Sequence, residues 1–408
     1  MSFYDHIIVG GGILGASIAY HLSRKSNESI LVLERNEFAS GASSHSAGLV
    51  LQGSTKKSNV PLAKKTVEVI SQLEEELGDT VGYHKTGSLR LASSKERVDE
   101  LNSMIETAST FNVDVSVPND QDIKRMAPWL NQEEIKQAAF FSTDGYVDSY
   151  LLTWSYIKAA RNNGVKFSSK LAATDIITEG SKICGINTAG GKIFSPNLIL
   201  AGGVWTSLFA SKIEVSIAAA PVRSHYWLTE PDPYYGSEGS ITIMPDISAY
   251  TRPELGGLLV GVQENECAVF DARKLPENLE YFSATLGEDH WDILLNSYSD
   301  LSRFFPKIES ANFCSYISGL SSYTPDGEII LGPITEINGL YIAAGDCGSG
   351  VSLSGGVGSV ISEIILNGES DLFSSSFMPN RFGKVDPFDI GFLNKCAMAR
   401  SAKSRKMK

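Results

Sequence analysis

The feature that most constrains the fold of this chain is a glycine-rich turn near its start. Residues 5–9 (Asp-His-Ile-Ile-Val) predict a short buried strand, and Gly10, Gly12 and Gly15 follow it directly. Apolar residues then recur at helical spacing, and residues 30–33 (Ile-Leu-Val-Leu) predict a second buried strand. Strand, glycine turn, helix and strand in this order form the βαβ unit that binds a dinucleotide. The chain is therefore expected to be an α/β protein built on a parallel sheet.

The residues of this unit each have a physical task. The first glycine allows the tight turn, the second lets backbone N–H groups approach a pyrophosphate, and the third lets helix and strand pack closely. Ile13 and Leu14 open the helix, whose N-terminus favours the negative phosphates. Glu34 ends the second strand, where its carboxylate can accept a hydrogen bond from a ribose hydroxyl and would repel a 2′-phosphate. NADP is therefore not expected.

A run of small residues follows Glu34 and indicates which of two dinucleotides, FAD or NAD, the chain binds. Residues 39–48 (Ala-Ser-Gly-Ala-Ser-Ser-His-Ser-Ala-Gly) predict a backbone that passes close to an extended cofactor. A nicotinamide enzyme would normally continue into another βα unit at this point, so we expect FAD. The residues of this segment that are expected to contact FAD are Arg35, Ser43, His45, Ala47, Gly48 and Leu49.

The composition argues against several other classes of protein. The chain has 408 residues, of which 35 are basic and 47 acidic, and its formal charge of −12 disfavours nucleic acid as a partner. Its five cysteines form no CxxC pair and its six histidines have no ligand spacing, so no metal is expected. The chain lacks an apolar run of about 18 residues, so no membrane span is expected. The first apolar run begins too early to leave room for a leader peptide, so a cytoplasmic protein is expected.

Motifs along nearly the whole chain carry a resemblance to a known family. Beyond the first βαβ unit they include residues 87–92 (Gly-Ser-Leu-Arg-Leu-Ala), 144–148 (Asp-Gly-Tyr-Val-Asp), 201–206 (Ala-Gly-Gly-Val-Trp-Thr), 323–327 (Tyr-Thr-Pro-Asp-Gly) and 339–345 (Gly-Leu-Tyr-Ile-Ala-Ala-Gly). With these motifs the sequence resembles the FAD-dependent D-amino-acid oxidase superfamily. The resemblance implies an FAD enzyme that oxidises a carbon–nitrogen bond.

Within this superfamily the sequence is most similar to the dimethylglycine and sarcosine dehydrogenase branch. That branch carries a Gly-x-[Ser/Thr]-x-His-x-Ala-Gly-Leu segment, which stands here at residues 41–49. Residues 355–358, 368–372 and 379–384 agree with the same branch. The resemblance implies that His45 binds the flavin covalently through an imidazole nitrogen. The alternative is a non-covalent hydrogen bond from this histidine to the flavin or the pyrophosphate.

The sequence also departs from its relatives. Dimethylglycine dehydrogenases continue into a folate-binding domain, which is not expected here because the chain stops at Lys408. Glycine oxidases place an arginine where this chain has Gly348, and monomeric sarcosine oxidases attach FAD to a cysteine where it has Gly319. His225 stands one position away from the histidine of a His-Gln-Tyr segment in the dehydrogenase branch.

The resemblance implies two discontinuous domains. We expect a Rossmann-like FAD-binding domain of the glutathione-reductase type and an α+β substrate domain built on an antiparallel sheet. The FAD-binding domain is expected to take residues 1–85, 145–215 and 315–375, the substrate domain residues 86–144 and 216–314, and a C-terminal extension residues 376–408. From Lys395 onward the extension has six basic residues and no acidic ones, which predicts a solvated, disordered tail. A membrane or partner contact is the alternative for this tail.

The family arrangement implies further site residues. The chain is expected to pass the flavin at Gly202 and Trp205, and a second glycine-rich loop is expected to lead into a helix whose N-terminus stabilises negative charge on reduced flavin. The residues expected in that loop and helix are Gly345, Asp346, Gly350, Val351, Ser352 and Leu353. The residues expected at the substrate are Tyr250, Arg252, Tyr323 and His225. The arginine of this set could pair a carboxylate, and each of the four could instead be structural.

The expected reaction is removal of hydride from a carbon that bears an amine, with flavin N5 as acceptor, followed by hydrolysis of the imine. The resemblance favours N-methyl glycines as substrates and oxygen or an electron-transfer protein as electron acceptor. The alternative is a flavin-carrying subunit of a multi-subunit amine dehydrogenase that passes electrons to partner proteins. A reductase with a second dinucleotide site is not expected, because the chain shows no second strand–glycine–helix unit.

Overall fold

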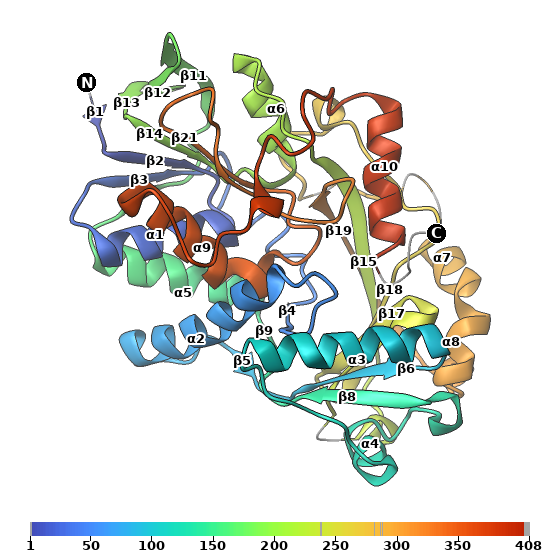
Figure 1. Ribbon diagram of the computed structural model, residues 1–408. Helices are drawn as coiled ribbons and strands as arrows, with labels where there is room; N and C mark the ends of the chain where they lie inside the picture. Colours follow the sequence, from blue (N-terminus) through green and yellow to red (C-terminus); the bar gives the residue numbers. More distant parts are fainter. Residues whose placement is uncertain (1, 237–238, 281, 286, 288, 404–408) are drawn as a thin grey trace.

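A six-stranded sheet forms the centre of one half of the molecule (Figure 1). The computed structural model describes residues 2–236, 239–280, 282–285, 287 and 289–403. Across the sheet the strands are β10 (Lys166–Ser168), β3 (Ile30–Leu33), β2 (His6–Val9), β14 (Asn197–Leu200), β21 (Leu340–Ala344) and β20 (Ile330–Pro333). Neighbours run parallel except for β20, which pairs antiparallel with β21 at one edge. The predicted βαβ unit is confirmed, with α1 (Ile13–Lys25) between β2 and β3.

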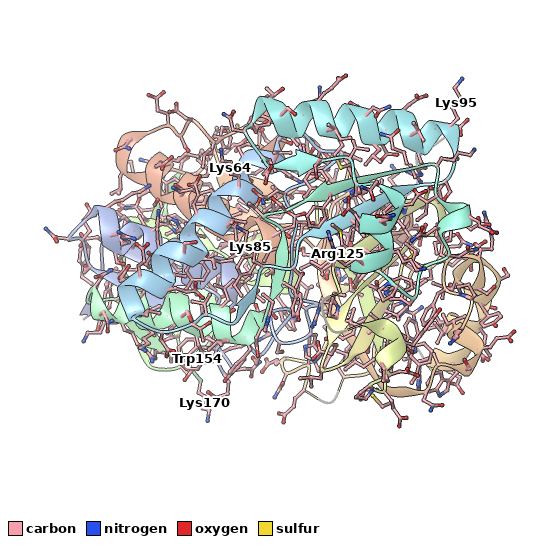
Figure 2. All side chains as sticks on the ribbon, turned by 90° about the horizontal axis from the view of Figure 1, so that it is seen from below. Lys64, Lys85, Lys95, Arg125, Trp154 and Lys170 are labelled. Carbon is pink, nitrogen blue, oxygen red and sulfur yellow. The ribbon has the colours of Figure 1, made fainter. Side chains whose placement is uncertain are left out.

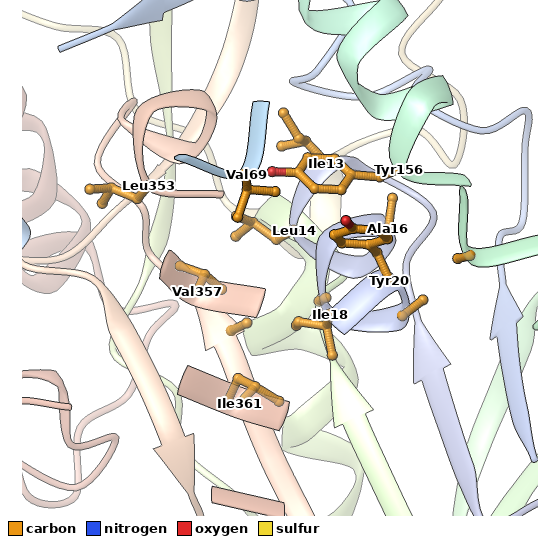
Figure 3. Close-up of a cluster of buried hydrophobic side chains, with 14 of the residues drawn as sticks. Ile13, Leu14, Ala16, Ile18, Tyr20, Val69, Tyr156, Leu353, Val357 and Ile361 are labelled. Carbon is orange, nitrogen blue, oxygen red and sulfur yellow. The ribbon is translucent and has the colours of Figure 1, made fainter. Parts of the chain in front are cut away.

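The strands of this sheet are continuously apolar because both of its faces are covered. Ile8 and Ile199 pack on the face that carries the helices, while Ile7 and Leu198 pack on the opposite face, as alternation along a strand requires. The helices on the first face are α1, α2 (Asn59–Leu77), α5 (Ser149–Asn162) and α9 (Gly350–Asn367), and Figure 3 shows the core between them. The opposite face is covered by the sheet of β1 (Ser2–Phe3), β13 (Gly191–Phe194), β12 (Lys182–Thr188) and β11 (Ala173–Glu179).

Helix α9 approaches α1 and α2 closely because glycines stand on its buried faces. A Cβ atom on Gly356 would lie 2.4 Å from the Cα of Leu62 in α2. A Cβ atom on Gly358 would lie 2.4 Å from the Oγ of Ser17 in α1. By length and composition α9 could also cross a membrane, but 78% of it is buried in the protein. In this structure α9 is therefore a core helix, and its glycines serve packing.

Replacing Gly356 with alanine is expected to lower the free energy of unfolding by about 1–3 kcal/mol, because the added methyl group overlaps the backbone of α2. Gly190→Ala is the matched control, since the nearest neighbour of a Cβ atom there would be the Oγ1 of Thr188, at 3.6 Å. Urea unfolding of both variants, followed by circular dichroism, measures the difference. Equal stability of the two variants would contradict this account of the α2–α9 contact.

The other half of the molecule is built on an eight-stranded sheet. In order its strands are β19 (Phe313–Tyr323), β15 (Ala220–Thr229), β18 (Gly257–Val262), β17 (Ala249–Glu254), β16 (Ile241–Met244), β6 (Ser88–Ala92), β8 (Gln137–Phe141) and β7 (Val115–Ser116). Neighbours are antiparallel except for β16 and β6, which run parallel. The helices that accompany it are α3 (Lys95–Thr110), α4 (Asp120–Met126), α7 (His290–Asn296) and α8 (Tyr298–Phe304). A Rossmann-like sheet beside a mainly antiparallel one confirms the expected fold class.

Smaller elements connect the two halves. A three-stranded sheet of β4 (Leu49–Val50), β9 (Gly145–Val147) and β5 (Tyr83–His84) lies between them, and α6 (Thr206–Ala210) follows β14 (Figure 1). One expected domain boundary falls inside a strand. Because β19 pairs with β15 from Phe313 to Tyr323, residues 315–323 belong to the large sheet and not to the FAD-binding half.

The C-terminal extension contains a packed helix where a disordered tail was predicted. Helix α10 (Ile390–Ser401) packs against β15 and β19 (Figure 1). Its buried residues are Phe392, Leu393, Cys396, Ala397, Ala399 and Arg400. The prediction was wrong for residues 395–403 because it weighed the positive charge and overlooked the helical spacing of Phe392, Cys396 and Arg400. Residues 404–408 of the predicted tail lie outside the described residues.

Several other basic side chains are exposed to solvent at the surface of the molecule. Figure 2 shows Lys95 and Lys170 projecting from the edges of the molecule. Lys170 pairs with exposed Glu37 at 2.7 Å, and Arg125 pairs with Asp122 on the same helix at 3.0 Å. Such exposed pairs contribute little to stability. The burial of a charged residue in α10 therefore requires a separate explanation.

Candidate active site

A cavity of about 790 Å³ lies between the two halves of the molecule. Ligand pockets commonly measure about 300–1,000 Å³, so this one has room for a large cofactor or for a cofactor with a small ligand. Its walls come from the βαβ unit, the loop before α9, strands β15, β17 and β19, and the end of α10.

The βαβ unit forms the end of the cavity that fits a pyrophosphate. Gly10 has a φ of 116°, and a Cβ atom there would lie 2.3 Å from a carbonyl oxygen after β14, so only glycine fits. A Cβ atom on Gly15 would lie 2.0 Å from the carbonyl oxygen of Gly10, which explains the close packing of α1 on β2. A Cβ atom on Gly12 would meet only the Oγ of Ser43, at 3.3 Å, so the protein leaves space at Gly12. The same Oγ accepts a hydrogen bond from the N–H of Ile13 at 3.0 Å.

Glu34 and Arg35 shape the next part of the cavity. The carboxylate of Glu34 accepts hydrogen bonds from the N–H groups of Gly11 (2.9 Å) and Asn36 (2.8 Å), which hold it at the end of β3. The guanidinium of Arg35 stacks on Trp205, with its Cζ 3.8 Å from the ring centroid. Burial lowers the pKa of Arg35, and its Nη2 has no hydrogen-bond partner among the described residues. This carboxylate and this aromatic wall fit the ribose and base of an adenine nucleotide.

His45 lines the cavity in the segment that follows Glu34 and Arg35. Its Nδ1 is 3.1 Å from the carbonyl oxygen of Gly41, which can only accept a hydrogen bond. The Oγ of Ser44 also lies 3.1 Å from Nδ1. In the tautomer with its hydrogen on Nδ1, the ring donates to the Gly41 oxygen and Nε2 keeps its lone pair. A Cβ atom on Gly319 would lie 2.7 Å from the Cβ of His45, so the two positions are in contact. These are the two positions at which the resembling branches attach their flavin, and the fold brings them together.

The start of α9 forms another wall. The side chain of Ser349 makes no capping hydrogen bond to the helix. The carboxylate of Asp346 accepts hydrogen bonds from the backbone N–H groups of Gly348 (3.2 Å) and Gly350, the first residue of α9, and the N–H groups that follow remain for other acceptors. The Oγ of Ser352 donates a hydrogen bond to the carbonyl oxygen of Leu49 at 2.8 Å, which ties α9 to the segment after His45. The other residues predicted here that line the cavity are Gly345, Asp346, Gly350, Val351 and Leu353. A helix N-terminus at this place favours a negatively charged ligand.

Nearly all of the predicted cofactor residues line the cavity; the exceptions are Gly15 and Gly48. Gly48 has a φ of 70°, and a Cβ atom there would lie 2.0 Å from the carbonyl oxygen of Val147 in β9. Both glycines therefore act behind the cavity wall, where they allow neighbouring backbones to approach. Gly202 and Trp205 line the cavity.

Three of the four predicted substrate residues line the other end of the cavity. They are Tyr250 on β17, Tyr323 at the end of β19 and His225 on β15. Burial raises the pKa of both tyrosines, so each phenol stays protonated at neutral pH and can donate a hydrogen bond. The Nε2 of His225 lies 3.1 Å from a carboxylate oxygen of Glu264, and burial lowers the pKa of this histidine. This histidine is thus held by a protein carboxylate.

Arg252 is not the carboxylate clamp that the sequence suggested. It does not line the cavity; its Nε donates to the carbonyl oxygen of Ala47 at 2.7 Å, and its Nη1 pairs with Glu254. Its Cζ lies 4.5 Å from the ring centroid of Tyr146. The prediction for Arg252 is therefore corrected, because these partners occupy its donors. Its place is to hold the backbone of the segment that follows His45.

Two cations that the sequence prediction assigned to the disordered tail stand in the cavity wall instead. Arg400 is only 3% exposed, and Lys403 follows it at the end of α10. The Nζ of Lys403 donates hydrogen bonds to the carbonyl oxygen of Cys347 (2.7 Å) and to the Oγ of Ser349 (3.2 Å). The contact joins the end of α10 to the loop before α9. The only sequence signal for it was the helical spacing of apolar residues ahead of Arg400.

Several curated relatives of this chain carry the names of amine-oxidising enzymes. The chain is 28% identical over 388 residues to mitochondrial dimethylglycine dehydrogenase of Rattus norvegicus, a match that covers 93% of this chain and 45% of that protein. It is 29% identical over 379 residues to 4-methylaminobutanoate oxidase (formaldehyde-forming) of Paenarthrobacter nicotinovorans, covering 92% of this chain and 45% of that protein. The chain thus spans about half the length of these curated relatives.

One solved structure shares the fold of this chain, and one family model matches most of its sequence. The structure of L-proline dehydrogenase from P. horikoshii superposes with a TM-score of 0.82 at 24% identity, covering 93% of this chain and 98% of that one, which shows a shared fold. The family model described as FAD dependent oxidoreductase matches residues 5–364. The residues around the cavity fit FAD, from the glycine cradle to the start of α9. The chain therefore belongs to the DAO family of FAD-dependent oxidoreductases.

Proposed function

We propose that this protein uses FAD to oxidise the carbon–nitrogen bond of a small amino acid whose nitrogen carries an alkyl group. The observation that carries the proposal is the shape of the cavity, which joins a dinucleotide cradle to a compartment lined by tyrosines and cations. Dimethylglycine, 4-methylaminobutanoate and L-proline appear in the names of three similar proteins, and each combines an N-alkylated amine with a carboxylate. This shared chemistry supports the substrate class.

The residues of the compartment account for the steps that the protein itself must perform. FAD supplies the acceptor for the hydride that leaves the carbon beside the nitrogen. The phenols of Tyr250 and Tyr323 can orient the substrate by hydrogen bonds. The N-terminus of α9 stabilises the negative charge that develops nearby. The amine binds in its neutral form and needs no protein base, which agrees with the engagement of His225 by Glu264. Water then hydrolyses the imine.

We further propose that His45 holds the flavin covalently. Two observations support this attachment. The Nδ1 of His45 lies 3.1 Å from the carbonyl oxygen of Gly41 and can donate to it, which leaves the lone pair of Nε2 for a bond to the flavin 8α carbon. That bond would replace a C–H bond of the 8α-methyl group. The methyl group and the imidazole would each lose a proton, the flavin ring would take up the electron pair, and the electron acceptor of the enzyme would reoxidise it. The side chain also touches Gly319, the position that carries the attaching cysteine in another branch.

Product analysis distinguishes the members of the substrate class. Purified holoenzyme is supplied with sarcosine, dimethylglycine, 4-methylaminobutanoate or L-proline, with oxygen or an artificial electron acceptor. Oxidation of an N-methyl group releases formaldehyde, whereas oxidation of proline gives a cyclic imine without it. We expect formaldehyde from at least one N-methyl substrate, and turnover of proline alone would contradict the N-methyl preference. Turnover with the artificial acceptor but not with oxygen would identify a dehydrogenase.

A further inference from the structure

The strongest unexplained feature of the cavity is the guanidinium of Arg400. It is 3% exposed, and one of its nitrogens, Nη2, donates to the carbonyl oxygen of Val262 at 3.3 Å. Its Nε and Nη1 are buried and have no hydrogen-bond acceptor among the residues that the structure describes. A buried cation without an anion costs several kcal/mol, because it has lost its water and gained nothing in exchange. The arrangement therefore requires a negatively charged partner.

Glu264, the carboxylate whose charge acts on Arg400, does not meet that requirement. Glu264 has other partners, since its two oxygens lie 3.0 Å from the Nε of Arg223 and 3.1 Å from the Nε2 of His225. Burial alone would raise the pKa of Glu264, but the contact with His225 and the charge of Arg400 lower it to about 2. Arg400 thus affects Glu264 at a distance and forms no ion pair with a carboxylate in the described part of the chain.

Arg400 lines the cavity, so we expect its negatively charged partner to bind inside the cavity. Arg400 lines it together with Tyr250, Tyr323 and Gln263. Burial raises the pKa of both tyrosines, and the nearby charge of Arg400 counteracts that rise, so the phenols and the guanidinium share one compartment. Lys403, two residues after the end of α10, donates a hydrogen bond to the loop before α9 and so ties the same stretch of chain to that loop. The end of α10 is thereby held beside the N-terminus of α9.

We propose that Arg400, on the C-terminal helix α10, binds the carboxylate of the substrate. The inference rests on the proposed function and deepens it, because it assigns the carboxylate of an N-alkylated amino acid to a specific residue. Glycine oxidases, which this sequence resembles, place an arginine in the loop before α9 where this chain has Gly348. Arg400 would supply the positive charge that this loop lacks. A Cβ atom on Gly348 would lie 3.5 Å from the Nζ of Lys403, so the end of α10 brings its own positive charge to that place.

The first test measures binding without turnover. The holoenzyme is titrated with acetate, propionate and the neutral analogue acetamide, and the absorbance spectrum of the bound flavin is followed. Wild type is expected to show a saturable perturbation with both carboxylates and none with acetamide. Arg400→Met is expected to bind the carboxylates at least about 30-fold more weakly, because truncating one partner of a buried charge pair removes that much affinity or more. Arg400→Lys should restore part of the loss, and Arg125→Met, on the exposed surface of α4, should bind like wild type.

The unfolding temperature of Arg400→Met distinguishes a carboxylate-binding role of Arg400 from a structural role. Removing an unpaired buried charge is expected to leave the unfolding temperature of the protein without carboxylate unchanged or to raise it. Equal carboxylate affinity in wild type and Arg400→Met would overturn the proposal, as would a wild type that responds to no carboxylate. A loss of carboxylate binding in Arg400→Met, in a protein that oxidises no amine, would keep the carboxylate site and reject the proposed function. The two claims therefore fail independently.

Discussion

Alanine at Gly10 and alanine at Gly12 are expected to damage the protein in two different ways. At Gly10 the backbone has a φ of 116°, and the added methyl group would lie 2.3 Å from the carbonyl oxygen of Ala201. Strain of this kind costs about 1–3 kcal/mol, so Gly10→Ala should lower the unfolding temperature and abolish FAD binding together. At Gly12 the backbone is extended, and the methyl group would meet only the Oγ of Ser43, at 3.3 Å.

Gly12→Ala should therefore fold normally and fail only at the cofactor. The methyl group takes the space that the pyrophosphate needs, and overlap of that size weakens binding by about 10- to 100-fold. The FAD content of the purified variants and their unfolding temperatures without added FAD give both readouts. A Gly12→Ala protein with full FAD content would contradict the assignment of this space to the pyrophosphate. A Gly12→Ala protein as unstable as Gly10→Ala would show that the position serves the backbone.

Wild-type protein denatured in acid is expected to keep its flavin in the pellet, and His45→Ala is expected to release all of it. The reason is the position of the imidazole, whose Nδ1 lies 3.1 Å from the carbonyl oxygen of Gly41, so that Nε2 is the nitrogen available to form the bond. The flavin absorbance of pellet and supernatant measures the distribution.

His84→Ala is the matched control for this experiment. His84 is exposed and stacks on Tyr146 with 4.7 Å between ring centroids, so its loss should leave the flavin in the pellet. Flavin released from the wild type would reject the covalent bond and leave the non-covalent alternative for His45. It would not affect the assignment of the cavity to FAD, which rests on the glycines and Glu34.

The cofactor half of the site could be predicted because its signals are local in the sequence. Gly10, Gly12 and Glu34 lie within one βαβ unit, and the spacing of that unit fixes where their backbones meet in space. The fold class followed from the same unit together with the family motifs. Gly48 was predicted to contact the cofactor, but it does not line the cavity, and its lack of a side chain allows a close approach to β9.

The substrate half was harder because its residues come together only through long-range packing. Arg252 has the residue type of a carboxylate clamp, but its register on β17 directs it to Ala47 and Glu254. Arg400 sits in a basic C-terminal stretch that resembles a solvated tail, and its burial depends on α10 docking against β15 and β19. Composition alone could not reveal that docking. The apolar residues at helical spacing ahead of Arg400 were the available signal.

The central claim is that this DAO-family chain oxidises an N-alkylated amino acid with FAD. The most direct test is an anaerobic titration of the holoenzyme with sarcosine, dimethylglycine, 4-methylaminobutanoate and L-proline, following the absorbance of oxidised flavin. The account predicts that at least one of these compounds bleaches the flavin completely and at stoichiometric concentration, with the corresponding amines that lack a carboxylate far less effective. A flavin that stays oxidised with all four compounds, in a protein that binds FAD stoichiometrically, would contradict the account.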